Sequence, residues 1–297
     1  MEDSNKKNKI FEYVLLGIII VIILFSFLYL SNPNRKQDLV IHISSGQSMD
    51  SIIEELKVNN IIKENSFVFK LLVKLFSGSK IIPGDYLIEK DSSVWAIAWQ
   101  LSRGDHKVAQ IKITFREGIT NEEIANLLAD KLSGFRKDLF FEMTYDKQGY
   151  LFPDTYFFFS LDTKDEIIKK FTSNFDNKIK KLESQIKESN KSLEEIILMA
   201  SILEGEANGK EDIDIISGIL WKRISLGVPL QVDVDRLTYE RKGLPIAPLN
   251  NPGLMSINAA LNPKDSKYLY YLHDKNGEAH YAVSYEEHKK NINNYLK

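Results

Sequence analysis

One carboxylate of this chain lies where a protein could make a proton donor. The segment from Met199 to Ala207 reads Met-Ala-Ser-Ile-Leu-Glu-Gly-Glu-Ala. At 3.6 residues per turn, Glu206 shares one helix face with apolar residues at Ile196, Met199, Ile202 and Leu203. A carboxyl desolvated by aliphatic side chains has a raised pKa and can give up a proton near neutral pH. The alternative is an ordinary helical glutamate whose head reaches water.

An aromatic-rich stretch, residues 150–159, is the first candidate for substrate contact. It surrounds a Pro153-Asp154 turn, and flat rings with polar tips suit the apolar faces of sugars. Core packing is the alternative for most of these rings. We expect Tyr156 to be the cleft residue, because its hydroxyl requires a partner.

Two further segments carry candidate ligand-binding side chains. Leu230 to Asp233 alternates apolar and polar residues, so a strand there places Gln231 and Asp233 on one face. That face either lines a cleft opposite Glu206 or meets water. Residues 243–253 form a proline-rich loop in which Asn251 precedes a proline, and such a loop either holds a ligand amide or merely connects elements.

The N-terminus predicts a membrane anchor. Tyr13 to Leu30 is a run of 18 uncharged, mostly aliphatic residues, long enough to cross a bilayer, and no small-residue cleavage pattern follows it. We therefore expect a tail over residues 1–12 and a transmembrane helix over 13–31. Three lysines precede the run and two basic residues follow it, which favours a cytoplasmic N-terminus and an extracytoplasmic remainder.

Composition excludes several classes of chemistry. The 297 residues contain no cysteine, so disulfides and thiolate catalysis are ruled out, and the net charge of −2 gives no support for nucleic acid binding. The five histidines show no metal-ligand spacing, and no phosphate-binding glycine loop is present. We expect neither a metal nor another cofactor.

The rest of the chain predicts an α+β fold in two parts. A small module over residues 38–107 contains a strand, a turn at Gly46 and a helix capped by Ser48, and the same order returns 72 residues later around Gly118 and Thr120. A larger domain over 108–297 contains a helix pair over 164–191, a helix that Ser192 caps and that carries Glu206, a hairpin around Asn276-Gly277, and a last helix capped by Ser284.

Taken together, these segments resemble the MltG/YceG-like endolytic murein transglycosylases, membrane-anchored enzymes of bacterial cell walls. The resemblance covers nearly the whole chain. It rests on an ordered set of motifs: the anchor, a LysM-like module, Gly-Tyr-Leu-Phe-Pro-Asp-Thr-Tyr at 149–156, Ala-Ser-Ile-Leu-Glu-x-Glu at 200–206, Leu-Gln-x-Asp at 230–233, the Gly-Leu-Pro loop, Asn-Pro-Gly at 251–253 with its continuation to Pro263, and Glu-Glu-His at 286–288.

The resemblance implies an activity and a site. The second glutamate of the pair, Glu206, would be catalytic, and the enzyme would cleave the β-1,4 bond between N-acetylmuramic acid and N-acetylglucosamine in nascent strands, leaving 1,6-anhydro ends. Candidate substrate contacts are Gln231, Asp233, Tyr156, Glu204 and Asn251. Peptidoglycan polymerases would be partners, and the protein would be a single-pass protein of the cytoplasmic membrane.

The chain departs from the family pattern in two places. Gly205 stands where lysine is usual, and glycine costs a helix about 1 kcal/mol relative to alanine, so the helix ends or kinks there. The segment from Val234 to Lys242 is shortened. Two alternatives therefore stay open: a non-catalytic, membrane-anchored glycan-binding or scaffold protein, and an ordinary muramidase that uses water.

Overall fold

The computed structural model describes residues 12–23, 37–62, 66–206 and 212–296, which form two compact units. The first ends at Gln110 and also includes Phe159–Thr163; the second comprises Ile111–Phe158 and Lys164–Lys297. The division lies close to the boundary predicted between residues 107 and 108. The sequence did not predict that residues 159–163 belong to the first unit. A hydrogen bond links this segment to β2 (Gly84–Ile88), since the buried Asp85 carboxylate accepts from the Leu161 N–H at 2.8 Å.

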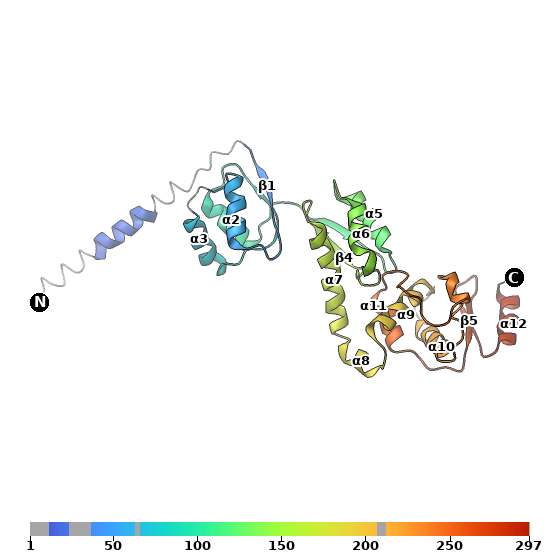
Figure 1. Ribbon diagram of the computed structural model, residues 1–297. Helices are drawn as coiled ribbons and strands as arrows, with labels where there is room; N and C mark the ends of the chain where they lie inside the picture. The colour runs from blue at the N-terminus through green and yellow to red at the C-terminus, as the bar shows by residue number, and fades with distance from the viewer. Residues whose placement is uncertain (1–11, 24–36, 63–65, 207–211, 297) are drawn as a thin grey trace, which may run out of the picture. The chain divides into compact units, whose positions relative to one another are not determined.

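The N-terminal helix occupies residues 12–23 in the described part of the chain (Figure 1). Within the described residues, no helix has the length and apolar character needed to span a bilayer. The remainder of the predicted anchor, residues 24–31, lies outside the described residues.

Beyond the N-terminal helix, the described residues of the first unit form one two-stranded sheet and three helices. Strands β1 (Leu39–Ile43) and β2 (Gly84–Ile88) are antiparallel, with Ile41 opposite Tyr86. The helices are α2 (Met49–Val58), α3 (Phe67–Ser77) and α4 (Val94–Arg103). Their inner faces form one core, which includes Leu56, Phe69, Val73, Tyr86, Ile97 and Leu101. The strand-turn-helix order predicted for this module is confirmed; its LysM-like character stays a prediction.

The second unit begins with a small sheet and its covering helices. Strand β3 (Ile111–Thr114) pairs antiparallel with β4 (Thr155–Phe158). The helical elements of this part are α5 (Asn121–Lys131), α6 (Lys137–Thr144), the 3-10 turn η1 (Tyr145–Lys147), α7 (Lys164–Lys180) and α8 (Glu183–Glu188). Their core combines aliphatic side chains with the aromatic rings of Phe115, Phe140, Tyr156, Phe158 and Phe171.

The remainder of the second unit builds around a buried helix, α9 (Leu193–Glu206), which packs on α11 (Leu254–Leu261). The other elements are α10 (Ile213–Ser225), the 3-10 turn η2 (Arg236–Tyr239), strands β5 (Tyr270–His273) and β6 (Ala279–Ala282), and α12 (Tyr285–Tyr295). In Figure 1 the hairpin and α12 lie at the C-terminal end of this unit. Eight successive residues of α9, 196–203, are buried, so this helix forms the centre of the core.

The capping residues in the sequence correctly predict where several helices begin. The side chains of Ser48, Thr120 and Ser284 accept hydrogen bonds from backbone N–H groups at the starts of α2, α5 and α12, as predicted. The Ser192 hydroxyl does the same for the Glu195 N–H before α9. The hairpin turn is also confirmed, with Gly277 at φ 83°, a conformation that favours glycine.

The strand predicted over Leu230–Asp233 is wrong. These residues have no ladder partner, and Gln231 has a φ of 53°, which interrupts extended backbone. The alternation of sides nevertheless holds, because Leu230 and Val232 are buried whereas Gln231 and Asp233 are exposed.

Candidate active site

Glu206 is the last residue of α9 and lies in a wall of a cavity of about 750 Å³. Its carboxylate accepts two hydrogen bonds, from the Tyr271 hydroxyl at 3.1 Å on Oε2 and from the Val234 N–H at 3.2 Å on Oε1. The side chain is half-buried. Among the described residues, its hydrogen-bond partners are thus one phenol and one backbone amide, whereas the helix-face argument predicted aliphatic surroundings.

Gly205 allows the backbone around Val234 to come close to the end of α9. A Cβ added at Gly205 would lie 2.6 Å from Cγ1 of Val234, so any side chain there requires Val234 to shift. Val234 is the residue whose N–H reaches Glu206. The two departures from the family pattern, Gly205 and the shortened segment that starts at Val234, are thus in direct contact.

Tyr271, on β5, keeps its proton over the whole physiological range. Burial raises the pKa of Tyr271 well above its usual value, and the neighbouring Glu206 carboxylate raises it further. Its hydroxyl therefore donates to Glu206 when that group is charged. This bond fixes the carboxylate in one orientation at the cavity wall.

Arg223 and Gln231 form a second pair in the same cavity. Nη2 of Arg223 donates to Oε1 of Gln231 at 2.6 Å, and Nε donates to the carbonyl of Pro229 at 3.0 Å. The guanidinium lies 5.4 Å from the ring centre of Tyr270. It is buried, which lowers the pKa of Arg223. Within the described residues, its hydrogen-bond acceptors are two backbone carbonyls and the Gln231 amide, all of them neutral.

Asp233 and Tyr239 contribute a further polar group to the wall. The Tyr239 hydroxyl donates to Oδ1 of Asp233 at 2.8 Å, and this bond raises the pKa of Tyr239, with burial adding to the effect. Asp233 is exposed. The cavity thus holds two carboxylates, those of Glu206 and Asp233.

His288 of α12 closes the cavity from the C-terminal side. Its ring stacks on Tyr270 at 5.2 Å between centres. Burial lowers the pKa of His288, and the nearby Arg223 charge lowers it further. The ring is therefore neutral at pH 7.

Glu204 is not part of this cavity. Its Oε2 accepts from the Gly253 N–H at 2.8 Å and from the Ser256 hydroxyl at 2.7 Å. These groups lie at the start of α11, where a carboxylate satisfies free N–H donors and complements the helix dipole. The interpretation of Glu204 as a substrate contact is thus replaced by a helix-capping role.

Asn251 is fully buried and does not line the cavity either. Its Oδ1 accepts from the N–H groups of Gly149 and Leu151, at 2.9 and 3.0 Å. Its Nδ2 donates to the Ile119 carbonyl at 2.9 Å and to Oδ1 of Asn121 at 2.8 Å. With all four hydrogen-bonding positions occupied by protein, Asn251 joins three chain segments and leaves nothing for a ligand.

Tyr156 is a core residue, contrary to the expectation that it lines the cleft. It is 8% exposed and its ring packs 4.5 Å from that of Phe171. The hydroxyl has its partner inside the protein, since it donates to the Phe152 carbonyl at 2.7 Å. Burial raises the pKa of Tyr156, in keeping with this position.

Comparison with known proteins agrees with this architecture. The model of the YceG-like family matches residues 41–235 and 237–294. The chain belongs to the YceG-like family. It is similar, at 29% identity, to a protein of Bacillus subtilis named endolytic murein transglycosylase, over 89% of this chain and 86% of that protein.

Two further comparisons extend this family placement. A Streptococcus pneumoniae protein of the same name is 22% identical over 88% of this chain, which spans 59% of that relative's length. The fold of the YceG-like chain is similar to the crystal structure of a YceG-like protein from Listeria monocytogenes, with a TM-score of 0.54, 24% identity, and coverage of 86% of this chain and 99% of the other. The α+β architecture is thus that of known YceG-like structures.

Sequence reasoning on this YceG-like chain missed several cavity residues. Arg223 lies on the same buried face of α10 as Ile216 and Leu220, so the helix-face argument that selected Glu206 would have found it. Tyr271 lies on a strand of the hairpin predicted around Asn276-Gly277, and the hairpin signal alone indicates no catalytic or binding role. The missed residues that line the cavity include Arg223, Tyr239, Tyr270, Tyr271 and His288.

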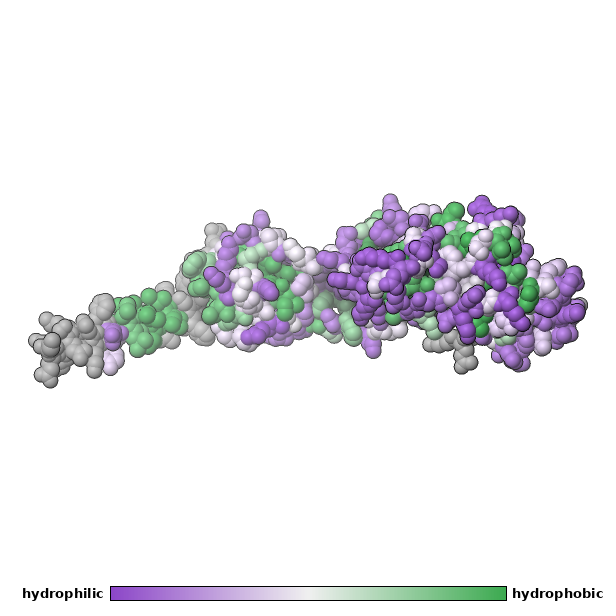
Figure 2. Space-filling model, turned by 90° about the horizontal axis from the view of Figure 1, so that it is seen from below, coloured by the Kyte–Doolittle hydropathy of each residue, from purple (hydrophilic) through white to green (hydrophobic). Residues whose placement is uncertain are grey.

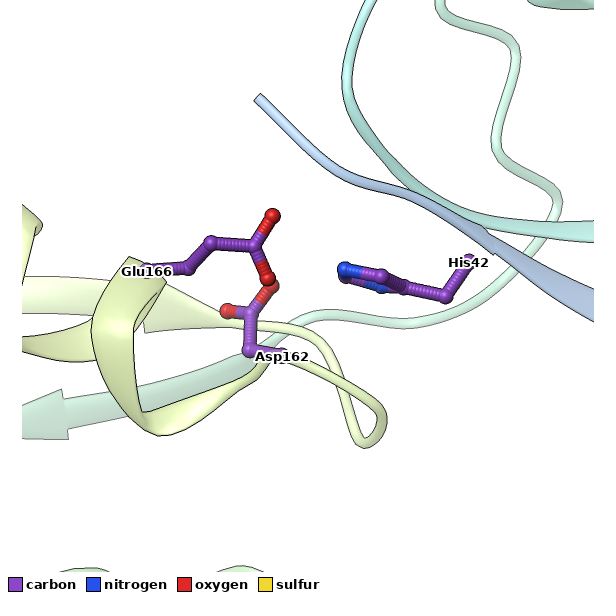
Figure 3. A group of neighbouring side chains, drawn as sticks. All are labelled: His42, Asp162 and Glu166. Carbon is purple, nitrogen blue, oxygen red and sulfur yellow. The ribbon is translucent and has the colours of Figure 1, made fainter. Parts of the chain in front are cut away.

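A separate group of titratable side chains, His42, Asp162 and Glu166, is drawn in Figure 3. Nδ1 of His42 is 2.6 Å from Oδ1 of Asp85, a contact within the first unit. Glu166 belongs to the second unit, whereas the other residues of the group belong to the first. We therefore base no metal site on this group.

Proposed function

We propose that this protein is an endolytic murein lytic transglycosylase with Glu206 as its catalytic acid and base. The observation that carries the proposal is the placement of Glu206, held by Tyr271 and Val234, in the wall of a 750 Å³ cavity. A cavity of this size suits a ligand of several hundred daltons. The names of the relatives supply the reaction class.

One acid is chemically sufficient for the reaction. Neutral Glu206 would protonate the glycosidic oxygen as the bond to the anomeric carbon breaks. The resulting carboxylate would take the proton of the substrate's own 6-hydroxyl while that oxygen attacks the anomeric carbon, which closes the 1,6-anhydro ring. The donors at Tyr271 and Val234 stabilise the carboxylate once its proton has moved.

Of the substrate contacts suggested by the sequence, Gln231 and Asp233 line the cavity, and we retain them as proposed contacts. Because an arginine only donates hydrogen bonds, Arg223 must face Oε1 of Gln231, which leaves the Nε2 donors on the other side of that amide. Those donors suit the carbonyl oxygen of an N-acetyl group. Asp233 accepts, and so suits a sugar hydroxyl.

The proposed substrate is the β-1,4 bond between N-acetylmuramic acid and N-acetylglucosamine in nascent strands, where cleavage would terminate elongation. We place the protein in the bacterial cytoplasmic membrane, anchored by residues 13–31, with the two units outside the cytoplasm and beside peptidoglycan polymerases. The uncharged run from Tyr13 to Leu30 supports the anchor.

The test is product analysis with the purified full chain in detergent. Uncrosslinked glycan strands are digested in water enriched in oxygen-18, and the new ends are identified by mass spectrometry. Anhydro ends without the heavy isotope support the proposal.

Two other results would reject it. Reducing ends that carry oxygen-18 would show that water is the nucleophile, an outcome for which the second carboxylate, Asp233, gives a structural reason. No product at all, under conditions where the Bacillus subtilis relative is active, would favour a non-catalytic glycan-binding scaffold.

A further inference from the structure

The first unit exposes an apolar face that its own core does not use. Along α3, Leu71 and Leu75 are one turn apart and are 54% and 76% exposed. On α4, Trp95 and Trp99 are 45% and 39% exposed. Figure 2 shows hydrophobic residues at the surface of this part of the chain. We call these four side chains the apolar face.

Phe76 joins the two helices into one surface. Its ring meets those of Trp95 and Trp99 edge-on, at 5.5 and 5.1 Å between centres. The two indoles are nearly parallel, with an interplanar angle of 3° and centres 5.9 Å apart. The tryptophans are thus held in place by packing rather than scattered on the surface, and a contiguous exposed patch of this kind marks an interaction site.

The charged residues of the two helices are basic. Helices α3 and α4 contain Lys70, Lys74 and Arg103 and no acidic residue, and Lys70 pairs with Asp50 of α2 at 2.6 Å. The Arg103 guanidinium lies 4.7 Å from the ring centre of Trp99. Exposed aromatic and aliphatic side chains with basic neighbours are the composition of surfaces that lie in the interface of an anionic bilayer.

The length of the chain brings a bilayer within reach. The uncharged run ends at Leu30 and β1 begins at Leu39, so eight residues separate them. Eight extended residues span at most roughly 30 Å. If residues 13–31 cross the membrane, the first unit cannot move far from the headgroups.

We propose that the apolar face docks the first unit on the outer surface of the membrane that anchors the chain, with Trp95 and Trp99 at the level of the lipid headgroups. This inference rests on the membrane location given under the proposed function. Docking would limit the reach of the catalytic unit to strands close to the membrane, where glycan is newly made.

The test uses the intrinsic fluorescence of the full chain reconstituted into vesicles. The vesicles contain phosphatidylglycerol and phosphatidylcholine with brominated acyl chains, which quench tryptophan at the interface. Trp95 and Trp99 are two of the three tryptophans, so bromine should lower the emission of the wild type by about twofold relative to unbrominated vesicles. A Trp95→Phe/Trp99→Phe variant, in which only Trp221 emits, should show no such loss.

A charge variant separates docking from anchoring. Leu71→Glu/Leu75→Glu places two charges at exposed positions, so the fold, checked by near-ultraviolet circular dichroism, should be retained while quenching is lost. Val58→Glu, at another exposed apolar residue of the same unit, is the matched control and should quench like the wild type.

Three results would overturn the proposal, each for a distinct reason. A chain that pellets with vesicles but is not quenched by bromine is anchored without docking. A chain that does not pellet has no anchor, and the apolar face then has no membrane to meet. A change of Trp95 and Trp99 emission on adding soluble glycan strands, without quenching by bromine, would assign the face to glycan instead.

Discussion

Arg223 holds the side-chain amide of Gln231 in one orientation, with Nη2 of the guanidinium 2.6 Å from Oε1. The arginine is buried, whereas the glutamine is exposed to the cavity. The buried guanidinium therefore fixes the orientation of the Gln231 amide, which can contact the substrate. The positive φ of Gln231 adds to this effect, because it directs the side chain away from the buried Leu230 and Val232 on either side.

The Gln231→Glu variant tests the orientation of this amide. Glutamate keeps the oxygen that Arg223 needs but lacks the Nε2 donors, so the fold should be unchanged while the substrate loses one hydrogen bond. We expect KM to rise about tenfold and kcat to change less. Steady-state kinetics on defined glycan oligomers measure both, and an unaltered KM would show that Gln231 does not contact substrate.

Glu206→Gln removes the proton donor and keeps the shape. We expect turnover to fall by at least about a hundredfold, because a positioned general acid contributes that much or more. Unfolding temperature and glycan binding should stay as in the wild type. Glu240→Gln, at an exposed glutamate of the same unit, should leave activity intact. Anhydro products from the Glu206 variant at the wild-type rate would disprove the assignment.

Tyr271→Phe removes the hydroxyl that orients Glu206. Since the pKa of Tyr271 is raised, the wild-type hydroxyl stays protonated to beyond pH 10. The variant therefore loses a neutral hydrogen-bond donor to Glu206 and no charged group. We expect kcat to fall about tenfold, because one donor that orients the carboxylate is gone. Steady-state kinetics measure this, and an unchanged kcat would mean that the hydroxyl only packs.

Asn251→Ala should affect stability rather than binding. It removes the partner of three buried groups, the N–H groups of Gly149 and Leu151 and Oδ1 of Asn121. We expect the free energy of unfolding to drop by about 3 kcal/mol. Urea titration of the full chain measures this, with Asn294→Ala, at an exposed position of α12, as the matched control. A normal urea midpoint with weakened glycan binding would restore Asn251 to the substrate contacts.

His288 makes stability depend on pH. Its pKa is lower in the folded chain than in the unfolded chain, so the unfolded chain binds more protons once the pH falls below about 6.5. Acid therefore favours unfolding. His288→Gln should lose less thermal stability than the wild type between about pH 7.5 and about pH 5.5. Equal losses in the two proteins, measured by thermal unfolding at each pH, would show that His288 titrates alike in both states.

The parts of the fold that depend on neighbouring residues could be predicted from sequence. The cap at Thr120 and the turn at Gly277 each require only a few adjacent residues, and both are confirmed. Asn251 could not be predicted in this way, because its partner Gly149 is 102 positions away. Tyr156 was misplaced for a different reason: its hydroxyl finds the Phe152 carbonyl four residues earlier, and no sequence pattern signals that bond.

The site was predictable where one helix decides the geometry. The spacing along α9 selected Glu206, and the same spacing along α10 would have selected Arg223. Tyr271 and Val234 approach Glu206 from separate segments, 65 and 28 positions away. Their roles depend on how the hairpin and the shortened segment fold back on α9, which a single sequence does not specify.

The network around Asn251 also bears on how relatives of this protein should be recognised. Several of the motifs that distinguish the family meet at this buried amide, where their hydrogen bonds stabilise the chain. A homologue that kept those motifs but carried another residue in place of Glu206 would fold alike and match the family equally well. Catalytic and inactive members should therefore be sorted by the few side chains around the cavity, and not by overall similarity.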